Sequence, residues 1–204
     1  MTAHSPPTSG GTMDLLEHLE RRLGRTRRGW TADADGRPLP FLVGQLGNGE
    51  LPDVESFVTT GLSEYPFDAP DADRRIRLEL LLSVRARYAD GPYPAVLQRI
   101  ALDMLRSGRP PLRGQVLGPR GAILPGSALE SFYLTTPCYY DAEFGSLESE
   151  GGFPVALAWL VPVARAEAAF VRKRGWDAFE DELERHDPDL LDPFRDPLPL
   201  PSRR

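Results

Sequence analysis

The chain has very few of the side chains that build metal sites and disulfides. Its 204 residues include one cysteine, Cys138, and three histidines, His4, His18 and His186. A single cysteine excludes an internal disulfide framework and a cysteine-based zinc cluster. The histidines are dispersed and lack the HExxH spacing, so we expect no metal site and no cofactor.

Long hydrophobic runs are also missing. The longest apolar stretch, residues 155–164, is about half as long as a membrane-spanning helix requires. The first twelve residues contain no basic side chain and no apolar run, so they lack the pattern of a secretory signal. We therefore expect a soluble, cytoplasmic protein without a membrane partner.

Lysine is nearly absent, because Lys173 is the one lysine among 24 basic residues. The net charge of −6 argues against a nucleic-acid-binding surface. Residues 1–140 carry 16 acidic and 16 basic side chains, whereas residues 141–204 carry 14 and 8. The acidic last third is therefore where we expect a basic partner to bind, since charge complementarity speeds association.

Proline and glycine, by contrast, are abundant, with 21 and 19 residues. They favour short elements joined by many turns. The Pro- and Gly-rich residues 1–12 are predicted to be a flexible tail, and residues 187–204 a proline-rich acidic C-terminal tail. Residues 13–186 then form a single domain.

Hydrophobic periodicity predicts the elements of this domain. Residues 75–85 alternate apolar and polar side chains, which is typical of a half-buried strand with one solvent-facing side. Residues 155–163 carry small residues on one face, which indicates a central strand covered by a helix. The pattern predicts an α+β domain with a mostly antiparallel or mixed β-sheet and several packing helices. Its further elements are a helix from Met13, strands at 38–46, 54–61 and 131–136, a short strand near Val116, and helices at 94–106, 165–174 and after Gly175.

Few residues are candidates for catalysis. Cys138 follows a strand, a position where nucleophiles occur, and Glu79 lies on the predicted wet face of residues 75–85. A surface ion pair explains Glu79 equally well. The arginines at 21–28 are predicted to form a solvated helix end rather than a phosphate-binding patch. We assign no catalytic residue.

From Glu55 onward the order of motifs resembles the Suppressor of fused (SUFU) family. Residues 57–66 are similar to its strand ending in a Gly-hydrophobic-Ser-Glu turn, and 75–82 to its next strand, with a glutamate inside an apolar run. The remaining similar motifs are 94–105, 131–137, the strand and helix at 155–167 with an early glutamate, 175–183, and the terminal Asp-x-x-Arg at 192–195.

The resemblance implies a non-enzymatic protein-binding domain. Animal members hold a transcription-factor peptide as an added strand between this domain and a second one. In them a tyrosine late in the amphipathic helix and an aspartate in the next loop contact the peptide. This sequence has Met104 and Gly118-Pro119-Arg120 in those regions, so neither residue is carried over.

Short bacterial members of the family are associated with toxin systems, as immunity proteins that neutralise a cognate toxin. The leading hypothesis is therefore an immunity protein that binds another protein, such as a basic toxin domain. The alternatives are a peptide-binding regulatory adaptor that acts by strand addition, and a cysteine-dependent hydrolase. The candidate binding residues are Gly61, Ser63, Tyr65, Arg77, Glu79, Tyr139 and Tyr140.

Overall fold

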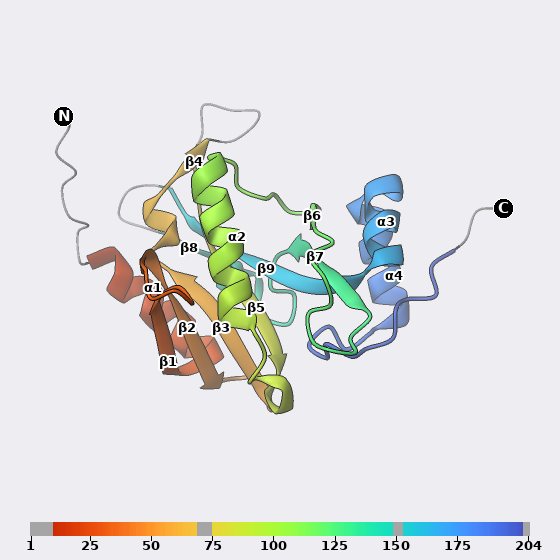
Figure 1. Ribbon diagram of the computed structural model, residues 1–204, viewed down its shortest axis with the longest axis horizontal. Helices are drawn as coiled ribbons and strands as arrows, with labels where there is room; N and C mark the ends of the chain where they lie inside the picture. The colour runs from red at the N-terminus through yellow and green to blue at the C-terminus, as the bar shows by residue number, and fades with distance from the viewer. Residues whose placement is uncertain (1–9, 69–74, 149–152, 202–204) are drawn as a thin grey trace.

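A mixed β-sheet with helices on both faces organises residues 10–68, 75–148 and 153–201, which the computed structural model describes (Figure 1). Its helices and strands, in chain order, are α1 (Gly10–Leu23), β1 (Gly24–Ala32), β2 (Pro38–Asn48), β3 (Val54–Thr60), η1 (Leu62–Glu64), β4 (Phe67–Asp68), β5 (Arg75–Arg85), η2 (Ala86–Tyr88), α2 (Tyr93–Ser107), β6 (Val116–Leu117), β7 (Leu129–Thr135), η3 (Ala142–Gly145), β8 (Ser146–Leu147), β9 (Val155–Ala164), α3 (Arg165–Arg174) and α4 (Trp176–His186).

The strand order is β1-β2-β3-β5-β9-β7-β6, with β4 paired to β5 and β8 paired to β9 outside this path. β5 and β9 run parallel, and the other neighbouring pairs are antiparallel. The predicted α+β class with a mixed sheet is thus confirmed. β9 lies between β5 and β7, which is the central place expected from its sequence.

Two apolar layers hold the helices to the sheet. On one face α2 buries Leu97, Ile100 and Met104 against a cluster that includes Phe57 and Leu80. On the other face lies a second cluster, to which α1, α3 and α4 contribute Leu15, Leu19, Leu23, Ala168, Val171 and Phe179. α1 and the pair α3–α4 stand toward opposite ends of the molecule (Figure 1).

This double coverage corrects the prediction for β5. Its bounds are those predicted, but residues 78–84 are all buried, so the strand has no solvent-facing side there. Leu80 and Leu82 pack in the α2 layer, while Leu81 packs in the opposite layer. Period-two alternation therefore reflected two chemically different buried faces, one of which contains Glu79.

The arginine-rich residues after α1 are also placed differently from the prediction. The helix ends at Leu23, and Arg25, Arg27 and Arg28 lie on the edge strand β1. Gly24 makes this turn with φ +83°, and a Cβ there would overlap the backbone of residues 47–49. The chain can reverse from α1 into β1 because glycine occupies this position.

The C-terminal segment, residues 187–201, contains no helix or strand, as its prolines predict. It nevertheless belongs to the packed unit, since Leu190, Leu191 and Leu198 are buried in the layer of α1, α3 and α4. The domain boundary predicted at 186 is thus displaced, because apolar residues between the prolines find places on the sheet. At the other end, α1 begins at Gly10, inside the predicted tail, and residues 1–9 lie outside the described residues.

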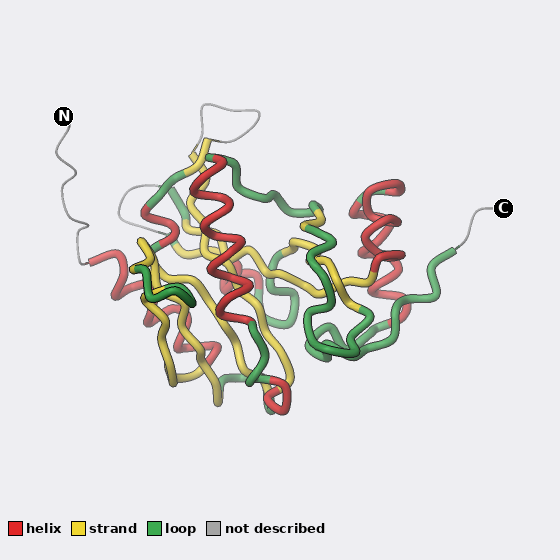
Figure 2. The backbone as a smooth tube through the Cα atoms, viewed as in Figure 1, coloured by secondary structure: helices red, strands yellow, loops and turns green. Residues whose placement is uncertain are grey.

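The connection from α2 to β7 is the longest stretch with little regular structure. In Figure 2 it runs as a loop beside α2, interrupted by the two residues of β6. This agrees with the loop and short strand predicted from its glycines and prolines. β6 forms one edge of the sheet and faces the side on which α2 ends.

Candidate functional site

Glu79 and the turn Gly61–Ser63, two of the predicted binding features, lie together inside the protein. The Glu79 side chain is completely buried. Its Oε1 accepts hydrogen bonds from the backbone N–H of Gly61 at 2.9 Å and of Ser63 at 3.0 Å. Its Oε2 accepts from the hydroxyl of Thr59 at 2.6 Å and from the N–H of Leu62 at 3.3 Å. The carboxylate therefore fixes the turn that ends β3.

Gly61 is required at this turn for its backbone, which has φ +96°. The hydroxyl of Thr59 accepts from the N–H of Leu80 at 2.8 Å, so the network also spans to β5. Burial raises the pKa of Glu79 to about 7, against the opposing effect of these hydrogen bonds. A carboxyl group enclosed in this way has no path to a substrate, which removes the catalytic alternative for Glu79.

Arg77 and Tyr65 border the same turn nearer the surface. The Nε of Arg77 donates to the carbonyl of Ser63 at 2.9 Å, and Tyr65 is 36% exposed at the end of η1. Ser63 itself is buried. Five of the predicted binding residues thus come together, but most of their polar groups are consumed in holding the turn.

Tyr139 and Tyr140 lie in a different place, on the loop after β7. The hydroxyl of Tyr139 accepts the N–H of Leu190 at 3.2 Å, and its ring lies 5.4 Å from that of Trp159. The ring of Tyr140 lies 4.5 Å from that of Phe144, and burial raises the Tyr140 pKa to about 12. Both rings fasten loops and the C-terminal segment to the sheet, and Tyr139 remains 37% exposed.

Cys138 precedes these tyrosines and lines a cavity of about 290 Å³ with Glu180 and Tyr139. Desolvation raises the pKa of its thiol above the usual value, and the Glu180 charge acts in the same direction. Both effects disfavour the thiolate that a nucleophilic cysteine needs. Among the described residues no group of His, Cys, Asp and Glu is arranged to hold a metal ion.

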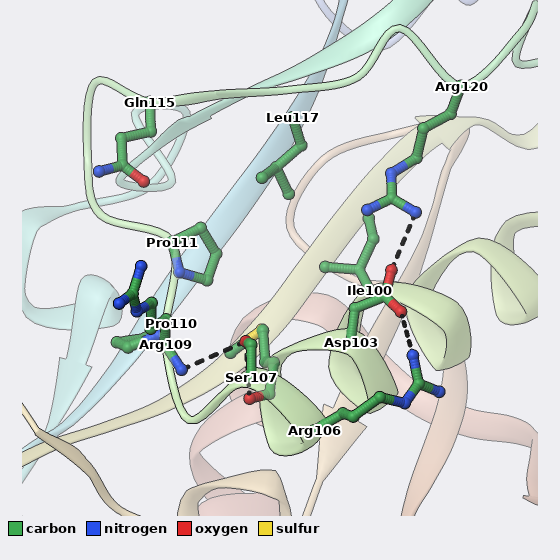
Figure 3. A pocket seen from close by; sticks show the side chains of 11 residues that line it. Ile100, Asp103, Arg106, Ser107, Arg109, Pro110, Pro111, Gln115, Leu117 and Arg120 are labelled. Carbon is green, nitrogen blue, oxygen red and sulfur yellow. Dashed lines mark hydrogen bonds and ion pairs between the residues drawn. The ribbon is translucent and has the colours of Figure 1, made fainter.

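An open cleft lies between the second half of α2 and the loop that carries β6 (Figure 3). Its volume is about 590 Å³. Ile100 and Met104, both buried, form an apolar floor together with the half-buried Leu117. Gly108 turns the chain at the end of α2 with φ +66°, and its N–H donates to the carbonyl of Met104 at 2.8 Å. The buried Pro110 and Pro111 continue the wall.

Three arginines give this cleft a positive charge. Arg106 and Arg120 reach Asp103 from opposite sides, at 2.9 and 3.0 Å, as Figure 3 shows. Arg109 also lines the cleft, and within the described residues its guanidinium has no ion-pair partner. The cleft is thus lined by three arginines and a single aspartate, and its positive charge suits carboxylates.

The sequence pattern matches the family model described as Suppressor of fused protein (SUFU) over residues 38–196. The chain belongs to the Suppressor of fused family. The predicted resemblance is therefore confirmed, and the match extends through the segment that contains Arg195. No curated protein matches the chain.

Solved structures show the same fold. A SUFU homolog from Neisseria gonorrhoeae has a TM-score of 0.73 and 17% identity, with 94% of this chain and 98% of that chain covered. A chain of the Sufu–Fu complex has a TM-score of 0.63 and 14% identity, covering 85% and 84%. Suppressor of Fused from Drosophila has a TM-score of 0.56 and 14% identity, covering 91% of this chain but 50% of that protein.

The family motifs acquire physical roles in this structure. The early glutamate of α3, Glu167, and the arginine of the terminal Asp-x-x-Arg, Arg195, form a buried pair with N–O distances of 2.7 and 2.8 Å. Met104 and Arg120 line one cleft. Sequence reasoning overlooked Arg106 and Arg109, although the four arginines that flank a Pro-Pro pair in residues 106–120 were a signal.

Proposed function

We propose that this SUFU-family chain acts by binding another protein, and that the α2–β6 cleft is where it binds. Suppressor of fused proteins are protein-binding regulators, and one similar structure is a complex of Sufu with Fu. The observation that carries the proposal is the cationic cleft with an apolar floor beside the sheet edge. Apolar contact area combined with arginines is typical of interface anchors.

The partner we propose is a bacterial toxin, which the chain would neutralise as its immunity protein. The chain's similarity to a bacterial homolog supports a bacterial role. Within the described residues, no helix is long and apolar enough to cross a membrane. We propose that the chain binds the toxin in the cytoplasm and neutralises it there.

The ion pairs within the chain bear on the charge that a partner would need. Several carboxylates of residues 141–204 form ion pairs within the chain: Asp189 pairs with Arg85, Asp192 with Arg87, and Glu180 with Arg113. The exposed carboxylates of α4, such as Asp181 and Glu184, lie outside the α2–β6 cleft, so the proposed binding surface does not include them. Because the cleft is lined by three arginines and one aspartate, we expect an acidic segment of the partner to bind there.

The test is co-expression with the proteins encoded beside its gene. Neutralisation predicts that one of them is toxic alone and harmless with this chain, and that the two co-purify. A regulatory adaptor that adds a peptide strand at the edge of β6 would also capture a partner, but without relieving toxicity. Absence of any captured protein, with turnover of a small molecule, would overturn protein binding.

A further inference from the structure

A second cavity lies on the other side of α2, between the start of this helix and the edge strand β1. Its volume is about 340 Å³. Buried Phe57 and Gln45 lie at its base, and Trp30 and Arg28 come from β1. The remaining lining comes from 32–34, 89–92, Pro94, Ala95 and Gln98. We call it the Trp30 pocket.

A β-bulge in β1 creates this pocket. Thr26 lies opposite Leu46, but Arg28 lies opposite Gln45, so Arg27 is one residue in excess. The bulge puts Arg28 and Trp30 opposite Gln45 and Val43, on the sheet face that α2 covers. Without the extra residue, Trp30 would point to the other face, because side chains alternate along a strand.

Buried polar contacts hold the bulge in place. Arg27, the extra residue, forms an ion pair with the carboxylate of Glu55, whose side chain is 4% exposed. Glu55 Oε2 also accepts from the Nε2 of Gln45 at 3.1 Å. A Cβ at Gly47 would overlap the Glu55 carboxylate, so glycine makes room for it. A buried carboxylate, paired with an arginine that is partly exposed, thus supports the strand geometry that forms the pocket.

The helix side of the pocket is equally fixed. Gln98, which is 7% exposed, donates from Nε2 to the carbonyl of Ala32 at 3.1 Å and so ties α2 to the end of β1. Within the described residues, the side chain of Gln45 makes one hydrogen bond, through Nε2, which leaves its Oε1 as an acceptor at the base. The pocket therefore combines two fixed carboxamides with aromatic walls.

The lining favours an aromatic occupant with a polar tip. The rings of Trp30 and Phe57 lie 6.3 Å apart and are tilted by 42°, and Trp30 is half-buried. Tyrosine and tryptophan bring a large apolar area and one hydrogen-bond donor, which the oxygen of Gln45 can accept. Arg28 is exposed and, in the described part of the chain, has no ion-pair partner. A carboxylate beside the aromatic ring would supply one.

We propose that the Trp30 pocket binds a tyrosine or tryptophan side chain of a partner protein, in a segment whose neighbouring Asp or Glu pairs with Arg28. This surface is separate from the α2–β6 cleft, and the inference does not depend on a toxin as the partner. The pocket holds an anchor residue of the kind that dominates interface energies.

The test uses the full chain and the capped peptide acetyl-Glu-Tyr-Asp-amide, followed by NMR of the tryptophan indole N–H groups. We expect a saturable shift of the Trp30 signal, with the Trp176 signal as an internal reference. Acetyl-Glu-Ala-Asp-amide should bind at least about 10-fold more weakly, since it lacks the ring. An unmoved Trp30 signal at millimolar peptide would overturn the proposal.

Matched variants locate the site. Ala95→Trp fills the mouth of the pocket from an exposed position of α2 and should abolish the shift. Arg99→Trp, exposed on the same helix but outside the pocket, should leave it unchanged. Arg28→Glu should weaken the acidic peptide at least about 10-fold. Equal binding of free tyrosine amide would contradict a protein segment as the occupant and indicate a small-molecule site.

Discussion

The buried carboxylates of β5 and α3 and the arginines of the α2–β6 cleft use charge in opposite ways. Glu79 and Glu167 are enclosed, and the groups around them satisfy their oxygens. At the open surface of the cleft, Arg106 and Arg120 share Asp103, and Arg109 lies beside them. The polar residue within the strand pattern, Glu79, therefore has a structural role here. The proposed binding surface is formed instead by a loop and the end of a helix.

The largest effect on stability is expected at the buried ion pair of Arg195 and Glu167. Arg195→Ala should lower the free energy of unfolding by about 3–5 kcal/mol, because it leaves the Glu167 carboxylate buried without its cation. The Glu167 carboxylate would then keep the hydrogen bond from the N–H of Leu198 but lose both bonds from the guanidinium. Urea unfolding measures the loss. Arg165→Ala, which removes an exposed partner of Glu130, is the control and should change stability far less.

A smaller, pH-dependent effect is expected at Glu79. Its pKa is raised from 4.5 to about 7 on folding, so the folded state binds the proton more tightly than the unfolded state. The stabilisation is present in full below about pH 4.5 and is lost as the pH rises through about 7. The stability advantage of the wild type over Glu79→Gln should shrink by on the order of 2 kcal/mol between about pH 5 and pH 8. An advantage that grows with pH would show that the carboxylate is the favoured buried form.

Substitutions of the cleft arginines should weaken partner binding but leave the stability of the fold nearly unchanged. Arg106→Ala and Arg109→Ala should each change the free energy of unfolding by less than about 0.5 kcal/mol, because both side chains are exposed. Thermal unfolding checks this. A loss comparable with that of Arg195→Ala would mean that the cleft arginines hold the fold together, and the contrast between the two regions would collapse.

The smallest effect is expected at Cys138. Because its thiol pKa is raised, it should react with a thiol probe at neutral pH more slowly than free cysteine. Cys138→Ser should leave partner binding unchanged. A fast reaction with a pH midpoint below that of free cysteine would revive the hydrolase alternative.

Local patterns were sufficient to predict most of the elements, including the bounds of β5 and the end of α2 at Gly108. They could not show that both faces of β5 are covered, since burial depends on which layers pack against the sheet. The sequence analysis did not predict β1, because the arginines of this strand were interpreted as the end of the preceding helix. The pairing of Glu167 with Arg195 joins residues far apart in the chain, and no local pattern contains that contact.

The candidate site was only partly predictable for the same reason. The turn at 61–65 and the residues Arg77 and Glu79 were predicted as separate binding features, and the structure brings them together around a carboxylate that is enclosed rather than open. The cleft arises where Arg106 and Arg109 of the helix end meet Arg120 of a loop. That meeting depends on the path of the loop between α2 and β7, which its glycines and prolines do not fix.

The most direct measurement of the central claim is calorimetric binding of the co-purified partner to three forms of the chain. The double variant Arg106→Ala/Arg109→Ala should bind at least about 10-fold more weakly than the wild type. The matched variant Asp181→Ala/Glu184→Ala, on the exposed face of α4, should bind as the wild type does. Full affinity of the arginine variant, with loss in the α4 variant, would contradict the cleft and place the partner on the acidic face.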